Sequence, residues 1–167
     1  MTPKDTTLSA GPDCNVFRRA AAKFATGITI VTTRAIDGTP HGFTANSFTS
    51  VSLTPPVLLV CVDFRCSVLP HLQIASHFGI NVLSENQRAL STRFAELPEG
   101  RFAGVDWSPG VTDVPLISGT LARFECRRSQ IVEIGDHAVV IGEVLTAEVF
   151  AGRPLLFFDS GYQQIAE

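Results

Sequence analysis

The sequence lacks the short motifs that mark several common protein classes. Neither G-x-G-x-x-G nor G-x-x-x-x-G-K-[ST] occurs, so neither usual nucleotide-binding fingerprint is available. The longest apolar runs, 57–62 and 138–141, are strand-sized and far shorter than the ~20 residues of a membrane span. No charged-then-apolar leader opens the chain, and the four cysteines show no C-x-x-C spacing. These absences predict a cytoplasmic protein with no membrane partner.

An excess of positive charge is also missing. The formal net charge is −3, and arginines are scattered except for the pairs 18–19 and 127–128. No basic field favours a nucleic-acid partner. With 167 residues and 45% hydrophobic content, the chain is long enough for one domain. We expect a flexible tail over 1–12 and a single domain over 13–167.

Acid–base and metal-binding groups are few. The chain contains no G-x-S-x-G elbow, and its scattered serines do not assemble into a Ser-His-Asp set, which disfavours hydrolysis. On a helix, His71 and His77 would face different sides, so no metal site is expected. Hydride transfer between two bound cofactors needs little such machinery and is compatible with this composition.

Patterning predicts many strands and few helices. Asp13 caps a predicted helix that runs to about Phe24, with Gly27 as its left-handed stop. A β-branched strand over 28–33 and the segment 41–54 form a predicted hairpin around Asp37-Gly38. Ser67 and Gln87 begin two short predicted helices. Further predicted strands are 57–62, 78–83, 119–127, 130–134, 137–150 and 155–158.

The arrangement of these elements favours an antiparallel barrel. The run 57–62 is apolar throughout, which is typical of a strand buried on both faces at the centre of a sheet. Residues 97–115 are rich in proline and glycine and predict a long irregular loop that covers a site. Regular β-α alternation is absent, so a doubly wound sheet is disfavoured.

The segment 41–56 is the strongest candidate for a binding site. Thr44, Asn46, Ser50 and Ser52 recur at a spacing of two, which places short polar groups on one face of a strand. Such a face is suited to a polar ligand. The alternation is imperfect, because Phe48 lies among the polar residues.

Other candidates have both a functional and a structural interpretation. Ser67 could help to hold a phosphate or could simply cap a helix. Ser91 and Arg93 could bind a ligand or lie on a solvated helix face. His137 follows a Gly-Asp turn at the mouth of a strand, where an imidazole is either a ligand contact or an exposed turn residue. Cys61 is most simply a small, partly buried apolar residue.

Several blocks of sequence, in order, resemble one family. The blocks are 24–33, Asp37-Gly38, 41–48, 50–53, Pro55-Pro56, 81–83, 91–95, 135–137, 142–144 and Gly161-Tyr162. They resemble the short-chain flavin reductases, the reductase components of two-component flavin-dependent monooxygenases. The resemblance implies a Greek-key-like split β-barrel with a few peripheral helices, and a homodimer that binds FMN or FAD. Such an enzyme reduces the flavin with NADH or NADPH and hands it to a separate monooxygenase.

The same resemblance assigns roles to individual residues. His137 is implied to lie near the nicotinamide as the catalytic residue. Ser50, Ser52, Ser67 and Arg93 become candidates for the flavin phosphate. The full implied cofactor-binding set is Thr44, Ala45, Asn46, Ser47, Phe48, Ser50, Val51, Ser52, Cys61, Val62, Asp63, Ser67, Asn81, Ser91, Arg93, Phe94 and Tyr162.

One departure and one alternative accompany this interpretation. Phe43 stands where the family often has methionine, which would alter packing near the flavin ring. The competing hypothesis is a non-catalytic flavin-binding or electron-transfer module on the same barrel, or a haem or pyridoxal-phosphate relative.

Overall fold

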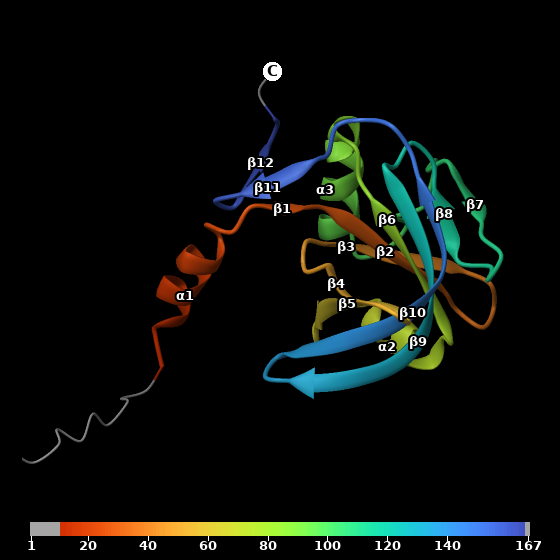
Figure 1. Cartoon of the computed structure of the whole chain (residues 1–167), viewed down its shortest axis with the longest axis horizontal. Coiled ribbons are helices and arrows are strands. Elements are labelled where there is room, and N and C mark those ends of the chain that lie inside the picture. Colours follow the sequence, from red (N-terminus) through yellow and green to blue (C-terminus); the bar gives the residue numbers. More distant parts are fainter. Residues whose placement is uncertain (1–10, 166–167) are drawn as a thin grey trace, which may run out of the picture.

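The computed structural model describes residues 11–165, so most of the predicted tail 1–12 lies outside the described residues. The described chain is mainly β, with three peripheral α-helices, as expected (Figure 1). The helices are α1 (Cys14–Ala21), α2 (Leu69–Ile74) and α3 (Arg88–Glu96), with a 3₁₀ turn η1 (Glu85–Gln87) before α3. The strands are β1 (Thr26–Gly27), β2 (Thr29–Arg34), β3 (Pro40–Ala45), β4 (Thr49–Leu53), β5 (Pro56–Asp63), β6 (His77–Val82), β7 (Trp107–Pro109), β8 (Pro115–Ile117), β9 (Ala122–Ile134), β10 (His137–Val149), β11 (Leu156–Phe158) and β12 (Gly161–Gln163).

The main sheet has seven strands in the order β3-β2-β6-β9-β10-β5-β4, and every neighbouring pair is antiparallel. Its two edge strands, β3 and β4, are consecutive in the chain. Four peptide steps separate Ala45 from Thr49, a span of at most about 15 Å. The two edges therefore approach each other, and the sheet rolls into a barrel that stays open between them.

The predicted β2–β3 hairpin is confirmed, and two other strand predictions need correction. The segment 41–54 is not one strand, because β3 ends at Ala45 and β4 begins at Thr49. The run 57–62 lies in β5, next to the edge strand β4, and not at the centre of the sheet. Its residues alternate between buried and half-buried, so only one face is in the core. The predicted strands 119–127 and 130–134 form the single strand β9.

Strand β2 is buried on both faces. Val31 packs into the cluster inside the barrel, together with Phe78 of β6 and Leu72 of α2. Ile30, one residue earlier, packs into a second cluster that includes Phe94 of α3. This alternation follows from the period of two in a strand. Helix α3 is thereby held against the outside of the sheet, which fixes one wall of the site described below.

The predicted loop 97–115 is partly ordered by a buried carboxylate. Glu125 of β9 accepts hydrogen bonds from the backbone N–H groups of Val111 and Thr112, at 3.1 and 2.7 Å. The Thr146 hydroxyl donates a further bond at 3.1 Å. Burial raises the pKa of Glu125, but the hydrogen bonds outweigh it and the net pKa is lowered. The loop also contributes β7, which pairs with β8, so it is less irregular than predicted.

The N-terminal helix stands apart from the barrel (Figure 1). The predicted cap is confirmed, because Asp13 accepts a 2.7 Å hydrogen bond from the Asn15 backbone N–H. The helix ends at Ala21, earlier than predicted, and none of its residues is buried. Gly27 is not a helix stop, because it lies in β1 and pairs with Leu156 of β11. Within residues 11–165, no helix combines the length and apolar character required to cross a bilayer.

Candidate functional site

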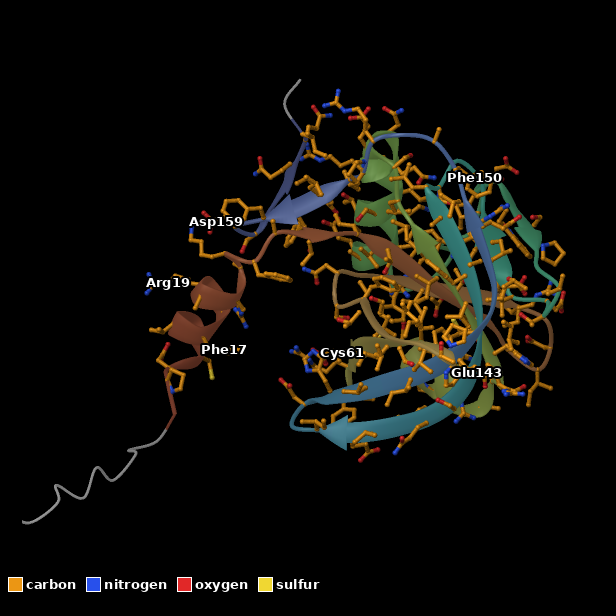
Figure 2. The ribbon with its side chains drawn as sticks, in the orientation of Figure 1. Phe17, Arg19, Cys61, Glu143, Phe150 and Asp159 are labelled. Carbon is orange, nitrogen blue, oxygen red and sulfur yellow. The ribbon has the colours of Figure 1, made fainter. Side chains whose placement is uncertain are left out.

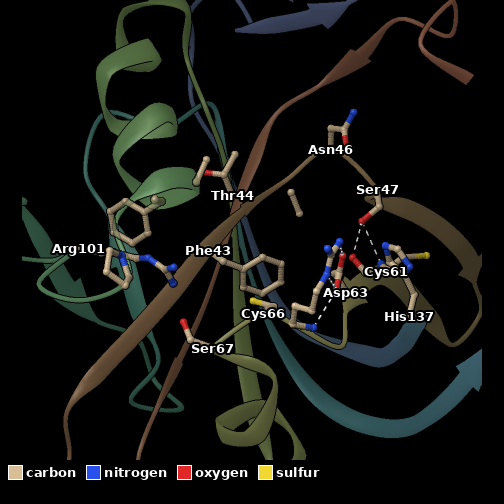
Figure 3. Close-up of a pocket in the computed structure, with 15 residues that line it drawn as sticks. Phe43, Thr44, Asn46, Ser47, Cys61, Asp63, Cys66, Ser67, Arg101 and His137 are labelled. Atoms are coloured by element: carbon tan, nitrogen blue, oxygen red, sulfur yellow. Dashed lines mark hydrogen bonds and ion pairs between the residues drawn. The ribbon is translucent and has the colours of Figure 1, made fainter. Parts of the chain in front are cut away.

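A cavity of about 670 Å³ opens at the split of the barrel (Figure 3). Its walls come from the end of β3 and the connection to β4, from β5 and the loop after it, from the end of α3, and from the start of β10. The lining residues are Phe43, Thr44, Ala45, Asn46, Ser47, Cys61, Asp63, Arg65, Cys66, Ser67, Phe94, Ala95, Pro98, Arg101 and His137. Segments far apart in the sequence therefore meet at one place.

Half of the residues predicted from the sequence line this cavity. They come from three strands, one helix, the connection between β3 and β4, and the loop after β5. The residues brought together are Thr44, Ala45, Asn46, Ser47, Cys61, Asp63, Ser67, Phe94 and His137.

Ser47 ties the connection between β3 and β4 to strand β5. Its hydroxyl donates to the Cys61 carbonyl at 2.9 Å and accepts from the Cys61 backbone N–H at 3.0 Å. At Cys61, β5 has no neighbouring strand on this side, because β4 pairs with it only as far as Leu59. Ser47 makes the two hydrogen bonds that such a strand would make. Figure 3 shows both bonds at the rim of the cavity. The segment 46–48 is thereby held over the opening.

Thr44 connects the cavity wall to helix α3. Its hydroxyl donates a 2.6 Å hydrogen bond to the Ser91 carbonyl. The Ser91 hydroxyl is in turn 3.0 Å from the hydroxyl of Tyr162 in β12. Ser91 is fully buried. Ser91 and Tyr162 therefore support the wall from behind and do not line the cavity.

Asp63 and His137 lie at the far end of the cavity. They are paired across β5 and β10. The guanidinium of Arg65 donates to Asp63 at 3.0 and 2.6 Å. These bonds, followed by one from the Arg65 backbone N–H, hold the pKa of Asp63 far below its usual range. The Asp63 carboxylate is therefore charged and paired at neutral pH.

The imidazole of His137 is anchored through one ring nitrogen. Its Nδ1 lies 2.6 Å from a carboxylate oxygen of Asp136. This hydrogen bond lowers the pKa of Asp136. The His137 side chain is 42% exposed. The second ring nitrogen is thus available on a side chain that the turn holds at the mouth of the cavity.

Other predicted residues lie in the core instead of the cavity. Val62 is 1% exposed and points into the barrel. Asn81 is fully buried, where it donates to the Ile30 carbonyl at 3.1 Å and accepts from the Ile117 backbone N–H at 2.8 Å. Phe48 packs against Phe124, with ring centroids 5.9 Å apart. The structure gives these three residues structural contacts. Strand alternation turns Val62 and Asn81 into the core, and Phe48 lies in the connection between β3 and β4.

The remaining predicted residues lie away from the cavity. Arg93 is on the outer side of α3, where it donates to the Gly100 carbonyl at 3.3 Å. Ser50, Val51 and Ser52 lie on the edge strand β4 and do not line the cavity. The strand is interrupted at residues 46–48, and β4 does not continue the line of β3. The expected polar face therefore does not extend past Ser47.

Sequence reasoning missed several residues of the cavity. Arg101 and Pro98 lie in the segment that we predicted to cover a site, which was the available signal. Phe43 was noticed only as a departure from the family pattern. The remaining members are Arg65, Cys66 and Ala95, which were not named as site residues although they lie beside the predicted Ser67 and in the block 91–95.

The cavity also has the features that a flavin requires. Its volume falls within the ~300–1,000 Å³ that is typical of small-molecule sites. Phe43, which is 8% exposed, and Ala45 give the wall of the cavity an apolar part. Arg101 provides positive charge, whereas the charge of Arg65 is paired with Asp63. The exposed Ser67 hydroxyl forms no hydrogen bond with residues 11–165. Ring and phosphate of a flavin therefore both find suitable groups in this cavity.

The rolled antiparallel sheet with a cavity at its opening defines a split β-barrel protein. A family model described as "Flavin reductase like domain" matches residues 21–166, and the chain belongs to this family. It is 46% identical over 151 residues to an FMN reductase (NADH) of Agrobacterium fabrum, a match that covers 90% of this chain and 85% of the relative. The solved NADH:FAD oxidoreductase of Streptomyces globisporus C-1027 superposes with a TM-score of 0.88 at 37% identity, covering 95% of this chain and 97% of that one.

Some relatives are much longer than this chain. A probable flavin reductase of Rhizobium meliloti is 45% identical over 150 residues, which cover 90% of this chain but 48% of the relative. The chain spans about half the length of this Rhizobium meliloti relative, and about half that of a reductase component from Acinetobacter baylyi.

We predict that Ser47→Ala destabilises the protein and weakens flavin binding. The substitution leaves the N–H and carbonyl of Cys61 without these partners, at a cost of about 1–3 kcal/mol. Urea unfolding and titration with FMN measure the two effects. Ser108→Ala is the matched control, because Ser108 is exposed in β7 and forms no side-chain hydrogen bond with a described residue. Equal stability of the Ser47→Ala variant and the unmodified protein would contradict the proposed bridge.

Proposed function

We propose that the protein is an NAD(P)H-dependent flavin reductase. It transfers hydride from NADH or NADPH to FMN or FAD and supplies the reduced flavin to a partner monooxygenase. The observation that carries the proposal is the cavity at the split, on which half of the residues implied by the family resemblance converge. The relatives that are named FMN reductase (NADH) and NADH-dependent FAD reductase support the same reaction.

The reaction needs few groups from the protein. Hydride leaves C4 of the reduced nicotinamide and, with one proton from solvent, converts the oxidised flavin to its reduced form and leaves oxidised nicotinamide. The flavin, when bound, supplies the hydride acceptor at N5. The protein holds both reactants in one orientation, which accounts for most of the rate. The cavity's carboxylate and imidazole, Asp63 and His137, are each held by a charged neighbour, Arg65 and Asp136, which agrees with this division of labour.

Each wall of the cavity has a task in this scheme. Thr44, Asn46 and the backbone between them face the flavin ring and the ribityl chain. Phe43 excludes water from one side of the ring, and Ser67 or Arg101 holds the phosphate. His137, anchored by Asp136, contacts the nicotinamide at the opposite end.

We expect the purified protein to oxidise reduced nicotinamide only when flavin is present. A steady-state assay at 340 nm with NADH and with NADPH, each combined with FMN and with FAD, measures the reaction. The four combinations also establish the preferred pair. Absence of flavin-dependent oxidation with every pair would refute the proposal. Bound flavin that is bleached slowly or not at all would instead favour the non-catalytic flavin-binding module.

We predict that His137→Ala impairs the use of nicotinamide more than the binding of flavin. The KM for NADH should rise several-fold, because a side chain that contacts the nicotinamide is lost, while the Kd for FMN should change less than twofold. Kinetics and fluorescence titration measure the two constants. His77→Ala is the control, because the His77 side chain lies outside the cavity. An equal loss of both affinities would contradict the role of His137.

A separate monooxygenase is the proposed consumer of the reduced flavin. Several relatives are named as reductase components or subunits of flavin-dependent monooxygenases, including one from Mycobacterium tuberculosis that is 38% identical over 161 residues.

We also propose that the protein is a homodimer. Helix α1 buries none of its residues against its own chain, although Phe17 is 65% exposed and Val16 49%. Figure 2 shows Phe17 on the side of α1 that faces the barrel across open space. An amphipathic helix that leaves its apolar face uncovered needs a partner surface. A second copy of the chain is the partner that we propose.

Sedimentation equilibrium should give a mass of about twice that of the chain. Phe17→Ser should weaken the dimer at least tenfold, because it removes the largest apolar side chain of α1. Ile36→Ser is the control: Ile36 is 92% exposed in the turn between β2 and β3, and Figure 1 shows this turn on the opposite side of the barrel from α1. A monomeric mass at micromolar concentration would contradict the assignment.

Two further expectations remain proposals. A cytoplasmic location is supported by the four cysteines, all of which are free thiols in the structure. A single domain over 13–167 is supported by the extent of the family match, which reaches from 21 to 166.

A further inference from the structure

A separate cavity of about 440 Å³ lies against helix α3. Its walls come from α3, from the segment 104–106 before β7, and from the end of β8. It shares no lining residue with the cavity at the split. The flavin site described above therefore does not account for this space.

The apolar part of this cavity is firmly packed. Ile117 of β8 is 1% exposed, and Leu90 and Val105 pack against the same buried cluster. The Ser118 backbone N–H donates to the Asp106 carbonyl at 3.0 Å, which joins two of the walls. The cavity is therefore formed before a ligand arrives, and one part of it suits an apolar group.

Arg93 brings a positive charge to this cavity. It is one of the ligand contacts expected from the sequence, but it does not line the cavity at the split. Its half-buried side chain donates one hydrogen bond, from Nη2 to the Gly100 carbonyl at 3.3 Å. Within residues 11–165 it forms no ion pair, and its buried Nε has no hydrogen-bond partner. A buried donor without a partner is unfavourable, so this guanidinium is suited to an acceptor that a ligand supplies.

Asp106 brings a negative charge to the same cavity. Its carboxylate is exposed and forms no hydrogen bond or ion pair with any residue in the described range 11–165. In particular, it does not pair with Arg93, although both residues line one cavity. The cavity thus offers one partner for an anion, one partner for a cation and an apolar surface.

We propose that this cavity binds a small zwitterion with an apolar body, of the amino-acid type. The carboxylate of the ligand accepts hydrogen bonds from Arg93, because a planar guanidinium can donate to both oxygens at once. The ammonium group of the ligand lies near Asp106, and its apolar body packs on the wall that contains Leu90. A plain anion or a plain cation would leave one of the two protein charges without a partner.

Phenylalanine tests the proposal, because two of its analogues each lack one charge. The analogue 3-phenylpropanoate has no ammonium group, and phenethylamine has no carboxylate. We expect phenylalanine to bind to the unmodified full chain and to shift the backbone NMR signals of residues 104–106 and 117–118, but not those of 44–47. Saturating FMN should leave the Kd for phenylalanine within about twofold, because the two cavities share no lining residue.

Two substitutions separate the charges. Arg93→Gln keeps a donor for the Gly100 carbonyl but removes the positive charge. It should weaken phenylalanine and 3-phenylpropanoate roughly tenfold and leave phenethylamine within about twofold, because a charge-assisted hydrogen bond is lost. Asp106→Asn should weaken phenylalanine and phenethylamine roughly threefold, since its carboxylate is exposed, and should spare 3-phenylpropanoate. Arg88→Gln and Glu96→Gln are the matched controls, because both residues are exposed on α3 and line neither cavity.

The proposal is overturned if phenylalanine does not bind at the limit of its solubility, or if its NMR shifts map to residues 44–47. It is also overturned if Arg93→Gln leaves the Kd for phenylalanine within about twofold. A loss with Arg93→Gln but not with Asp106→Asn would contradict it as well, because the cavity would then take a plain carboxylate. None of these measurements requires flavin reduction, so failure of the proposed function would leave this inference standing.

Discussion

The structure depends on a short connection between the two edges of one sheet. Strands β3 and β4 are neighbours in the chain but lie at opposite ends of the seven-stranded order, so residues 46–48 force the sheet to close on itself. The two hydrogen bonds between Ser47 and Cys61 hold this closure where no strand pairing exists. The same opening forms the cavity. The site is therefore a consequence of how the sheet closes.

The surrounding packing explains why this cavity can be both open and rigid. Val31 and Ile30 of β2 anchor the sheet to two separate hydrophobic clusters, and the second cluster fixes α3 through Phe94. Thr44 then joins the wall of the cavity to α3 through the Ser91 carbonyl. Preorganisation of this kind suits a reaction in which two cofactors carry the chemistry and the protein supplies orientation.

Much of the fold followed from the sequence, because it rests on local signals. The Asp13 cap, the Asp37-Gly38 hairpin and the apolar strands were predictable from spacing and turn chemistry. The central position of 57–62 was wrongly predicted, because a run of apolar residues does not reveal which strands pair with it. The break at 46–48 was missed for a similar reason: nothing in 41–54 signals that its two halves lie on opposite edges.

The candidate site was predictable in part, mainly through the family resemblance. Residues 44–47 and His137 reach the cavity, whereas Asn81 and Val62 belong to the core because of strand alternation. Arg101 was missed, since its position depends on the folding of a loop against Gly42.

A crystal structure of the protein with FMN tests the central claim most directly. The account predicts that the isoalloxazine ring lies at the split, in contact with residues 44–47, with its exposed face toward His137. A flavin bound elsewhere on the protein, with the cavity at the split empty, would contradict it.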